Sequence, residues 1–125
     1  MNILCQYCSK QAEFVSNAEV YGKPYGKSHM IYLCRKCDAY VGVHHNDPER
    51  PFGQLANKDV RDARKRAHRA VDPYWKSGEL SRRQVYTILS KAFGEDTHIG
   101  SADVELCERI TDLAQDEKKF TSYLK

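Results

Sequence analysis

The sequence lacks any run of about 18 or more apolar residues, so we expect no membrane-spanning helix. Its N-terminal stretch also lacks the apolar centre of a signal peptide, and we therefore expect a cytoplasmic protein that makes no membrane contact. Internal repeats and low-complexity segments are absent. The 125 residues are 41% hydrophobic and 30% charged, which excludes a disordered chain and is typical of one ordinary globular domain.

Several catalytic signatures are absent as well. There is no GxSxG, no Walker loop, no HExxH and no GxGxxG, so the corresponding enzyme classes have no support. A metal-dependent nuclease needs histidine and acidic side chains gathered around one ion. The sequence offers candidates in His44, His45, Asp47, His68 and His98, but they form no defining motif. We therefore expect a protein without enzymatic activity and keep the nuclease as an alternative.

The cysteines carry the strongest signal. There are five, an odd number in a chain without a secretion signal, which argues against a disulfide scaffold. Four of them form two CxxC pairs, Cys5/Cys8 and Cys34/Cys37. Each pair places two sulfurs on one ion from a single turn, and two pairs complete a closed four-thiolate shell. A redox pair is the competing interpretation, but no βαβ pattern accompanies either CxxC. The sequence predicts one structural Zn²⁺ ion.

The N-terminal part is predicted to be a zinc ribbon. Residues 12–20 and 30–33 are β-prone and are joined by the turn-rich segment 21–26. Residues 39–43 predict a third strand, which leaves residues 44–53 as a connector with two prolines. We expect about three short strands within residues 1–50.

The remainder is predicted to be helical. Apolar residues recur at spacings of three and four and predict a helix over roughly 54–71, and Asp72-Pro73 predicts a break or a restart of the helix. Ser81 and Gln84 form a capping-box pattern for a helix that stops at Gly94. A further helix is expected after Ser101, with Asp103 in its first turn and the fifth cysteine, Cys107, on its buried face. The predicted fold class is α+β: a ribbon over 1–50 packed on three to four helices over 51–125, as one compact domain.

One predicted helix is strongly basic. Residues 58–69 carry a net charge of +4, more than the +3 of the whole chain. Four zinc-bound thiolates and Zn²⁺ would lower the total by two, to +1, so the distribution of charge is more informative than its sum. Such a helix can contact the phosphates of a nucleic acid or bind an acidic protein surface. Alternatively, its charges pair with acidic residues nearby in the same chain. The candidate partner-binding residues are Lys58, Arg61, Arg64, Lys65, Arg66 and Arg69.

The chain also resembles a family of zinc-finger-containing proteins common in bacteriophages and prophages. The resemblance is carried by Cys34–His44, Pro51–Ala56, Arg61, Arg64, Ala67-His68, Asp72–Lys76, Ser81-Arg82, Tyr86, Leu89 and His98–Gly100. The sequence departs from the family pattern at Gln6, where proline is usual, and matches loosely at Glu13-Phe14. The resemblance implies a zinc-binding domain of phage origin but assigns no activity.

The matching motifs include three histidines, His44, His68 and His98. They either converge on one polar site or form a hydrogen-bonded interface between ribbon and helices.

From the zinc site, the basic helix and the resemblance we expect a small non-enzymatic zinc-binding protein that contacts nucleic acid, or a host protein that handles nucleic acid, through the basic helix. A protein-only inhibitor or adaptor acting on host or defence machinery is the first alternative, and the nuclease is the second. The sequence leaves the oligomeric state open.

Overall fold

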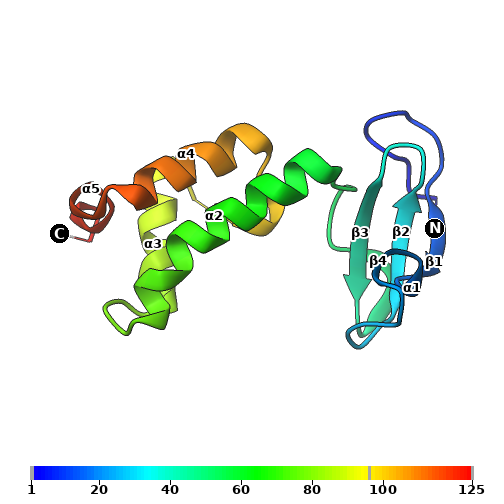
Figure 1. Cartoon of the computed structure of the whole chain (residues 1–125), viewed down its shortest axis with the longest axis horizontal. Helices are drawn as coiled ribbons and strands as arrows, with labels where there is room; N and C mark the ends of the chain where they lie inside the picture. Colours follow the sequence, from blue (N-terminus) through cyan, green and yellow to red (C-terminus); the bar gives the residue numbers. More distant parts are fainter. Residues whose placement is uncertain (1, 96, 125) are drawn as a thin grey trace. The chain divides into compact units, whose positions relative to one another are not determined.

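The computed structural model describes residues 2–95 and 97–124. They divide into two compact units, residues 1–58 and residues 59–125. The first unit contains the β-sheet and the second contains the long helices (Figure 1). The predicted α+β class is therefore confirmed, with strands gathered in the N-terminal part of the chain.

The first unit is a four-stranded antiparallel sheet in the order β1-β2-β3-β4. The strands are β1 (Glu13–Ser16), β2 (Met30–Cys34), β3 (Ala39–His44) and β4 (Asp47–Pro51). Tyr32 pairs with Phe14 on one side and Val41 on the other, and the adjacent Leu33 pairs with Glu13 and Tyr40. Because neighbouring residues of a strand point to opposite faces, these two rows define the two faces of the sheet.

The fourth strand lies where a connector was predicted. β4 contains two prolines, which have no N–H group to donate to a sheet. They are tolerated because β4 is an edge strand and pairs only with β3, with a register irregularity between Val43 and His44. The expectation of about three strands was one short for this reason.

The segment predicted as β-prone over 12–20 is also divided. Only Glu13–Ser16 is a strand, and Ala18–Tyr21 forms the single helical turn α1. The buried side chain of Asn17 separates them. Gly22, which follows α1, has φ 82° and Gly26 has φ 73°, so the 22–29 loop twice uses left-handed backbone that favours glycine.

One face of the sheet carries the ribbon's core. Tyr32 is 2% exposed, packs with Val43 and Leu55, and donates its hydroxyl to the Glu49 carbonyl at 2.6 Å.

The segment that leads to the long helix is held by this unit. Tyr40 and Ala56 exchange two backbone hydrogen bonds, of 3.2 and 2.9 Å. The ribbon thus includes residues up to the start of the next helix.

The second unit is built from α2 (Lys58–Lys76), α3 (Arg82–Phe93), the short 3₁₀ turn η1 (Ile99–Ser101), α4 (Val104–Gln115) and α5 (Glu117–Ser122). The predicted break at Asp72-Pro73 is wrong, because α2 continues through Pro73 to Lys76. The following residue, Tyr74, is 9% exposed. Its ring stacks on Phe120 at 4.3 Å and its hydroxyl donates to the Ala114 carbonyl at 2.6 Å. These contacts offset the cost of the proline.

The other helix boundaries follow local signals. The capping box is present, since Gln84 N–H donates to Ser81 Oγ and Ser81 N–H donates to Gln84 Oε1. α3 ends at Gly94 as predicted. Asp103 caps α4 by accepting from Leu106 N–H at 2.8 Å, so it precedes the first turn in which it was expected.

The core of the second unit is made by one face of each helix. It includes the fully buried Ile88, Leu89 and Ile110, and Cys107 is 0% exposed among them. The prediction that Cys107 is a buried core thiol is confirmed, and burial raises its pKa above the ordinary value. No helix of the described residues is long and apolar enough to cross a bilayer.

Candidate metal centre

Each CxxC pair lies in the turn of a small hairpin. The bridge between Leu4 and Gln11 closes the chain around Cys5 and Cys8. Cys34 ends β2 and pairs with Ala39 at the start of β3, which places Cys37 in the turn between them. The two turns therefore bring all four sulfurs to one end of the sheet.

The four sulfurs form a metal-binding group. Their ligand atoms all lie within 4.8 Å of one another, and Cys8 Sγ is 3.7 Å from Cys34 Sγ. Sulfurs at the vertices of a tetrahedron about 2.3 Å from zinc are about 3.8 Å apart, so this spacing fits zinc. It is far longer than a disulfide bond of about 2.05 Å, and all five cysteines are free.

The donor set also fits zinc chemically. Four thiolates leave no open coordination position, so the ion is structural rather than catalytic. Cys5 is 1% exposed and Cys34 is 8% exposed, which shields the centre from competing ligands. The chain holds one structural zinc ion, as the spacing predicted, and folding of a ribbon this small draws on metal binding.

Backbone N–H groups point at the sulfurs. Tyr7 N–H donates to Cys5 Sγ at 3.4 Å, and the Lys10 N–H bonds to Cys8. This second bond, with help from the neighbouring thiols, lowers the pKa of Cys8 to about 7. In contrast, burial and the neighbouring thiols raise the pKa of Cys37 to about 12. At neutral pH, Cys8 therefore loses its proton to form a thiolate more easily than Cys37 does.

The two turns share an unusual backbone feature. The residue after the second cysteine has left-handed backbone in each, with φ 64° at Ser9 and φ 50° at Asp38. Ser9 N–H donates to the Cys5 carbonyl at 2.8 Å, which closes the first turn.

The first turn also contains Gln6, where the family pattern usually has proline. The side-chain amide of Gln6 donates a hydrogen bond to the Leu55 carbonyl at 2.7 Å.

The candidate nuclease residues are divided between the two units. His44 ends β3, where its ring lies 4.2 Å from that of Phe52, and Asp47 begins β4. His68 belongs to α2, with Nδ1 3.9 Å from Asp72, and His98 precedes η1, with its ring 6.0 Å from that of Tyr86. Within either unit, no second group of three histidine, cysteine or acidic side chains that could hold a metal occurs among the described residues.

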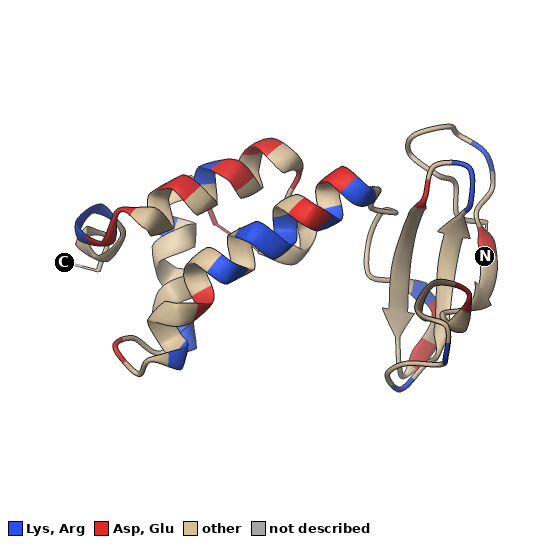
Figure 2. Cartoon of the chain, in the orientation of Figure 1, with Lys and Arg blue, Asp and Glu red and all other residues tan. Residues whose placement is uncertain are grey.

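The predicted basic residues all lie at the start or in the body of α2, whose Lys and Arg positions recur along the helix in Figure 2. They are not equivalent. Arg64 is half-buried, and its Nε donates to the Ala102 carbonyl at 2.9 Å, so it ties α2 to the start of α4. Lys65, Arg66 and Arg69 are exposed, and none of the three makes an ion pair or side-chain hydrogen bond to the described residues. Lys58 is exposed and Arg61 half-buried.

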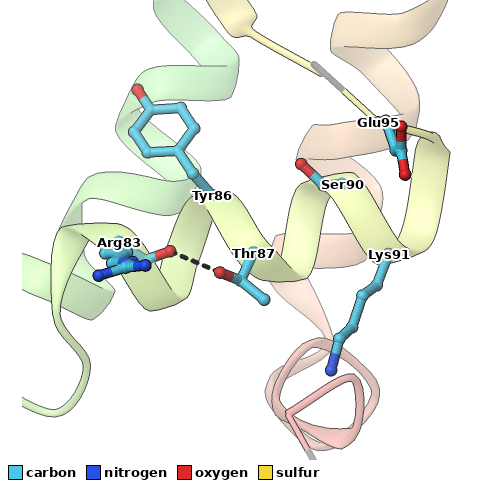
Figure 3. A pocket seen from close by; sticks show the side chains of 6 residues that line it. All are labelled: Arg83, Tyr86, Thr87, Ser90, Lys91 and Glu95. Atoms are coloured by element: carbon cyan, nitrogen blue, oxygen red, sulfur yellow. Dashed lines mark hydrogen bonds between the residues drawn. The ribbon is translucent and has the colours of Figure 1, made fainter.

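A shallow groove of about 530 Å³ runs along the exposed side of α3 (Figure 3). Its lining is Arg83, Tyr86, Thr87, Ser90, Lys91 and Glu95. Two of these side chains are already held: Thr87 donates to the Arg83 carbonyl at 2.9 Å, and Lys91 donates to the Tyr123 carbonyl at 3.1 Å. The lining has no histidine or cysteine and one carboxylate, so it is not a metal site.

Sequence reasoning missed a group of exposed aromatic rings on the ribbon. Tyr25 is 72% exposed, Phe52 is 65% exposed and Tyr21 is 50% exposed. The sequence indicated only that the chain has eight tyrosines. It did not show which rings lie on the same face, because some of them belong to loops whose path a sequence does not give.

Comparison with known protein families gives a match over most of the chain. The sequence profile of a family described as a zinc-finger-containing domain matches residues 1–117, which is nearly the whole chain. No curated protein and no solved structure matches significantly.

Proposed function

This chain belongs to the family of zinc-finger-containing domains, and from that premise we propose that it is a non-enzymatic binding protein that contacts nucleic acid through α2. The zinc centre has a closed ligand shell, so the ion itself offers no position to a partner and the contact has to be made by side chains. A nucleic acid is recognised first through its phosphates, by Lys and Arg side chains that are exposed and not neutralised by acidic neighbours.

One observation carries the proposal. Lys65, Arg66 and Arg69 are exposed and make no ion pair to the described residues. Lys65 and Arg69 are four positions apart and Arg66 and Arg69 are three positions apart in α2, so the three form one cationic surface. They lie opposite the buried side of α2, where Ala63, Ala67 and Val71 face the core. We call Lys65, Arg66 and Arg69 the cationic surface.

The same contacts refine the set of residues predicted from sequence. Arg64 already binds the Ala102 carbonyl, so its loss would disturb the packing of α2 and α4 rather than a partner. A test that changes Arg64 would confuse these two effects. The cationic surface is therefore the better target for substitution.

The proposal is tested by salt-dependent binding of the zinc-loaded chain to labelled duplex and single-stranded oligonucleotides. We expect Lys65→Gln/Arg66→Gln/Arg69→Gln to weaken both and to lower the slope of log affinity against log salt by about two to three units. The matched control is Arg83→Gln/Lys118→Gln/Lys119→Gln, which removes three exposed charges from α3 and α5. Equal affinity for the wild type and the cationic-surface variant would refute the proposal.

The resemblance to phage and prophage proteins supports host nucleic acid, or a host protein that handles it, as the partner. A protein-only adaptor would bind neither oligonucleotide under any salt condition, yet would retain a defined protein from nuclease-treated host lysate.

A further inference from the structure

The ribbon carries a row of aromatic rings on the sheet face opposite Tyr32, in which Tyr25, Phe52 and Tyr21 are exposed and Tyr40 and His44 are half-buried. Tyr40, Gly42 and His44 alternate along β3 and so lie on one face. The Phe52 ring covers Gly42, since a Cβ built there would meet that ring at 3.7 Å, and its centroid lies 4.2 Å from that of the His44 ring, tilted by 44°. The Tyr21 ring lies edge-on to that of Tyr40, with 6.2 Å between the ring centroids.

The row continues into the 22–29 loop. The Tyr25 ring lies 5.7 Å from Tyr21. We call Tyr25, Tyr21, Tyr40, Phe52 and His44 the aromatic row. The ring of Phe14 is excluded from it, because Phe14 pairs with Tyr32 on the core side of the sheet.

The exposed end of the row is held in place by a buried polar side chain. Asn17 is 6% exposed, and its amide donates to the Tyr25 carbonyl at 2.7 Å and accepts from Tyr25 N–H at 3.0 Å. A ring that is 72% exposed contributes little to the core. Holding the Tyr25 backbone in one conformation costs conformational entropy when the ribbon folds. Because that entropy is already lost, less is lost when a ligand binds to the ring.

At the Tyr25 end of the row the charge favours a polyanion. Lys23 and Lys27 flank Tyr25 in the same loop, are exposed and make no ion pair to the described residues. The acidic groups on the β1 and α1 side, Glu13 and Glu19, are both paired with Arg35, at 2.8 and 3.5 Å. The other end of the row lies beside β4, which carries Asp47 and Glu49.

From this arrangement we infer that the aromatic row stacks on the unpaired bases of a single-stranded nucleic acid, with Lys23 and Lys27 contacting its phosphates at the Tyr25 end. Bases in a duplex are stacked on one another and offer no free face, whereas single strands are bound by aromatic rings interleaved with cations. The inference rests on the proposed function only in taking the partner to be a nucleic acid.

The test measures binding of the zinc-loaded full chain to an unstructured oligothymidylate of about 15 nucleotides and to a hairpin duplex. We expect Tyr25→Ala/Phe52→Ala to lose about 5- to 150-fold in single-strand affinity for each base released, with duplex affinity little changed. Tyr25→Phe and Phe52→Tyr keep the rings and should bind like the wild type. Phe14→Ala is the matched control, since it removes a ring that is 41% exposed on the other face.

A direct readout uses the unaltered chain. Photo-crosslinking to bromodeoxyuridine oligonucleotides, mapped by mass spectrometry, should label Tyr25 or Phe52 rather than Phe14. Each variant must retain one zinc per chain, so that loss of binding is not loss of fold.

The outcomes separate this inference from the proposed function. Single-strand binding that depends on the rings but not on the cationic surface would uphold the aromatic row and refute the role of α2. Binding that depends on the cationic surface while Tyr25→Ala/Phe52→Ala and Phe14→Ala behave alike would overturn the aromatic row alone. A chain that binds neither oligonucleotide would overturn both, and in that case retention of a host protein by the same rings would identify the row as a protein-docking surface.

Discussion

Asn17 holds Tyr25 through both ends of its side-chain amide: its Nδ2 donates to the Tyr25 carbonyl and its Oδ1 accepts from the Tyr25 N–H. A third bond, from Asn17 N–H to the His29 carbonyl at 2.7 Å, ties the same residue to the end of the loop. One buried side chain thus sets the conformation of the 22–29 loop and the position of its exposed ring.

Replacing Asn17 by Ala should free this loop. The change leaves two backbone groups of Tyr25 without partners, and we expect a loss of about 1–3 kcal/mol in the free energy of unfolding of the ribbon. Hydrogen exchange at the Tyr25 amide should accelerate. Asn17→Asp is the informative control, because it keeps the acceptor for Tyr25 N–H and loses only the donor. Unchanged exchange in Asn17→Ala would show that the loop is held by other contacts.

Removal of zinc should unfold the ribbon and spare the helices. The core of the helical unit contains none of the four ligands, and its buried residues belong to the second unit alone. Chelation should therefore abolish tertiary structure in residues 1–58, while fluorescence of the single tryptophan, Trp75 in α2, stays native. Cys34→Ser should bind no zinc, whereas Cys107→Ala should bind one. Loss of the Trp75 signal on chelation would contradict the prediction.

Zinc affinity should increase with pH. Metal binds thiolates, so it must displace any proton that a cysteine still holds. Cys37, with a pKa of about 12, keeps its proton throughout the neutral range, and Cys8, with a pKa of about 7, gains one as the pH falls below that value. The dependence should steepen on the acidic side of neutrality. Competition with a chromophoric chelator of known protonation behaviour measures the zinc affinity at each pH. A zinc affinity that does not change with pH would contradict the prediction.

Ser9→Gly should stabilise the first metal-binding turn. Ser9 has φ 64°, a conformation that glycine adopts without the Cβ clash. No hydrogen bond of its side chain is lost, since Ser9 contributes only its N–H to the turn. We expect Ser9→Gly to be about 1 kcal/mol more stable than Ser9→Ala, which removes the same hydroxyl but keeps the Cβ. Thermal unfolding of the zinc-loaded ribbon compares the two, and equal midpoints would exclude backbone strain at this position.

Tyr74→Phe should destabilise the helical unit by about 1–2 kcal/mol. The Tyr74 hydroxyl donates to the carbonyl of Ala114 in the last turn of α4, where helix carbonyls have no helical partner. The ring itself, stacked on Phe120, is retained in the variant. Tyr86→Phe removes the hydroxyl of a half-buried tyrosine in α3 and should change the unfolding midpoint little. An equal effect of the two substitutions would disprove a specific role for this hydrogen bond.

Most of the zinc centre could be predicted from sequence because its signals are local. Two cysteines three positions apart fit one turn whatever the rest of the chain does, and the two pairs are gathered by a short hairpin. The capping box of Ser81 and Gln84 is local for the same reason. These features depend on residues within about one turn of backbone, so their geometry is set by chemistry along the chain.

Features that depend on distant residues were decided by the tertiary structure. The segment 47–51 is a strand because it pairs with β3 at an edge where its prolines need no partner. α2 passes through Pro73 because Tyr74 binds residues about 40 positions away. Which of the basic residues are exposed followed from the packing of α2, and the aromatic row exists because Tyr21 and Phe52 are brought beside Tyr40 and His44 of β3. The sequence by itself determined the ion and its ligands, and long-range pairing determined which side chains are left to meet a partner.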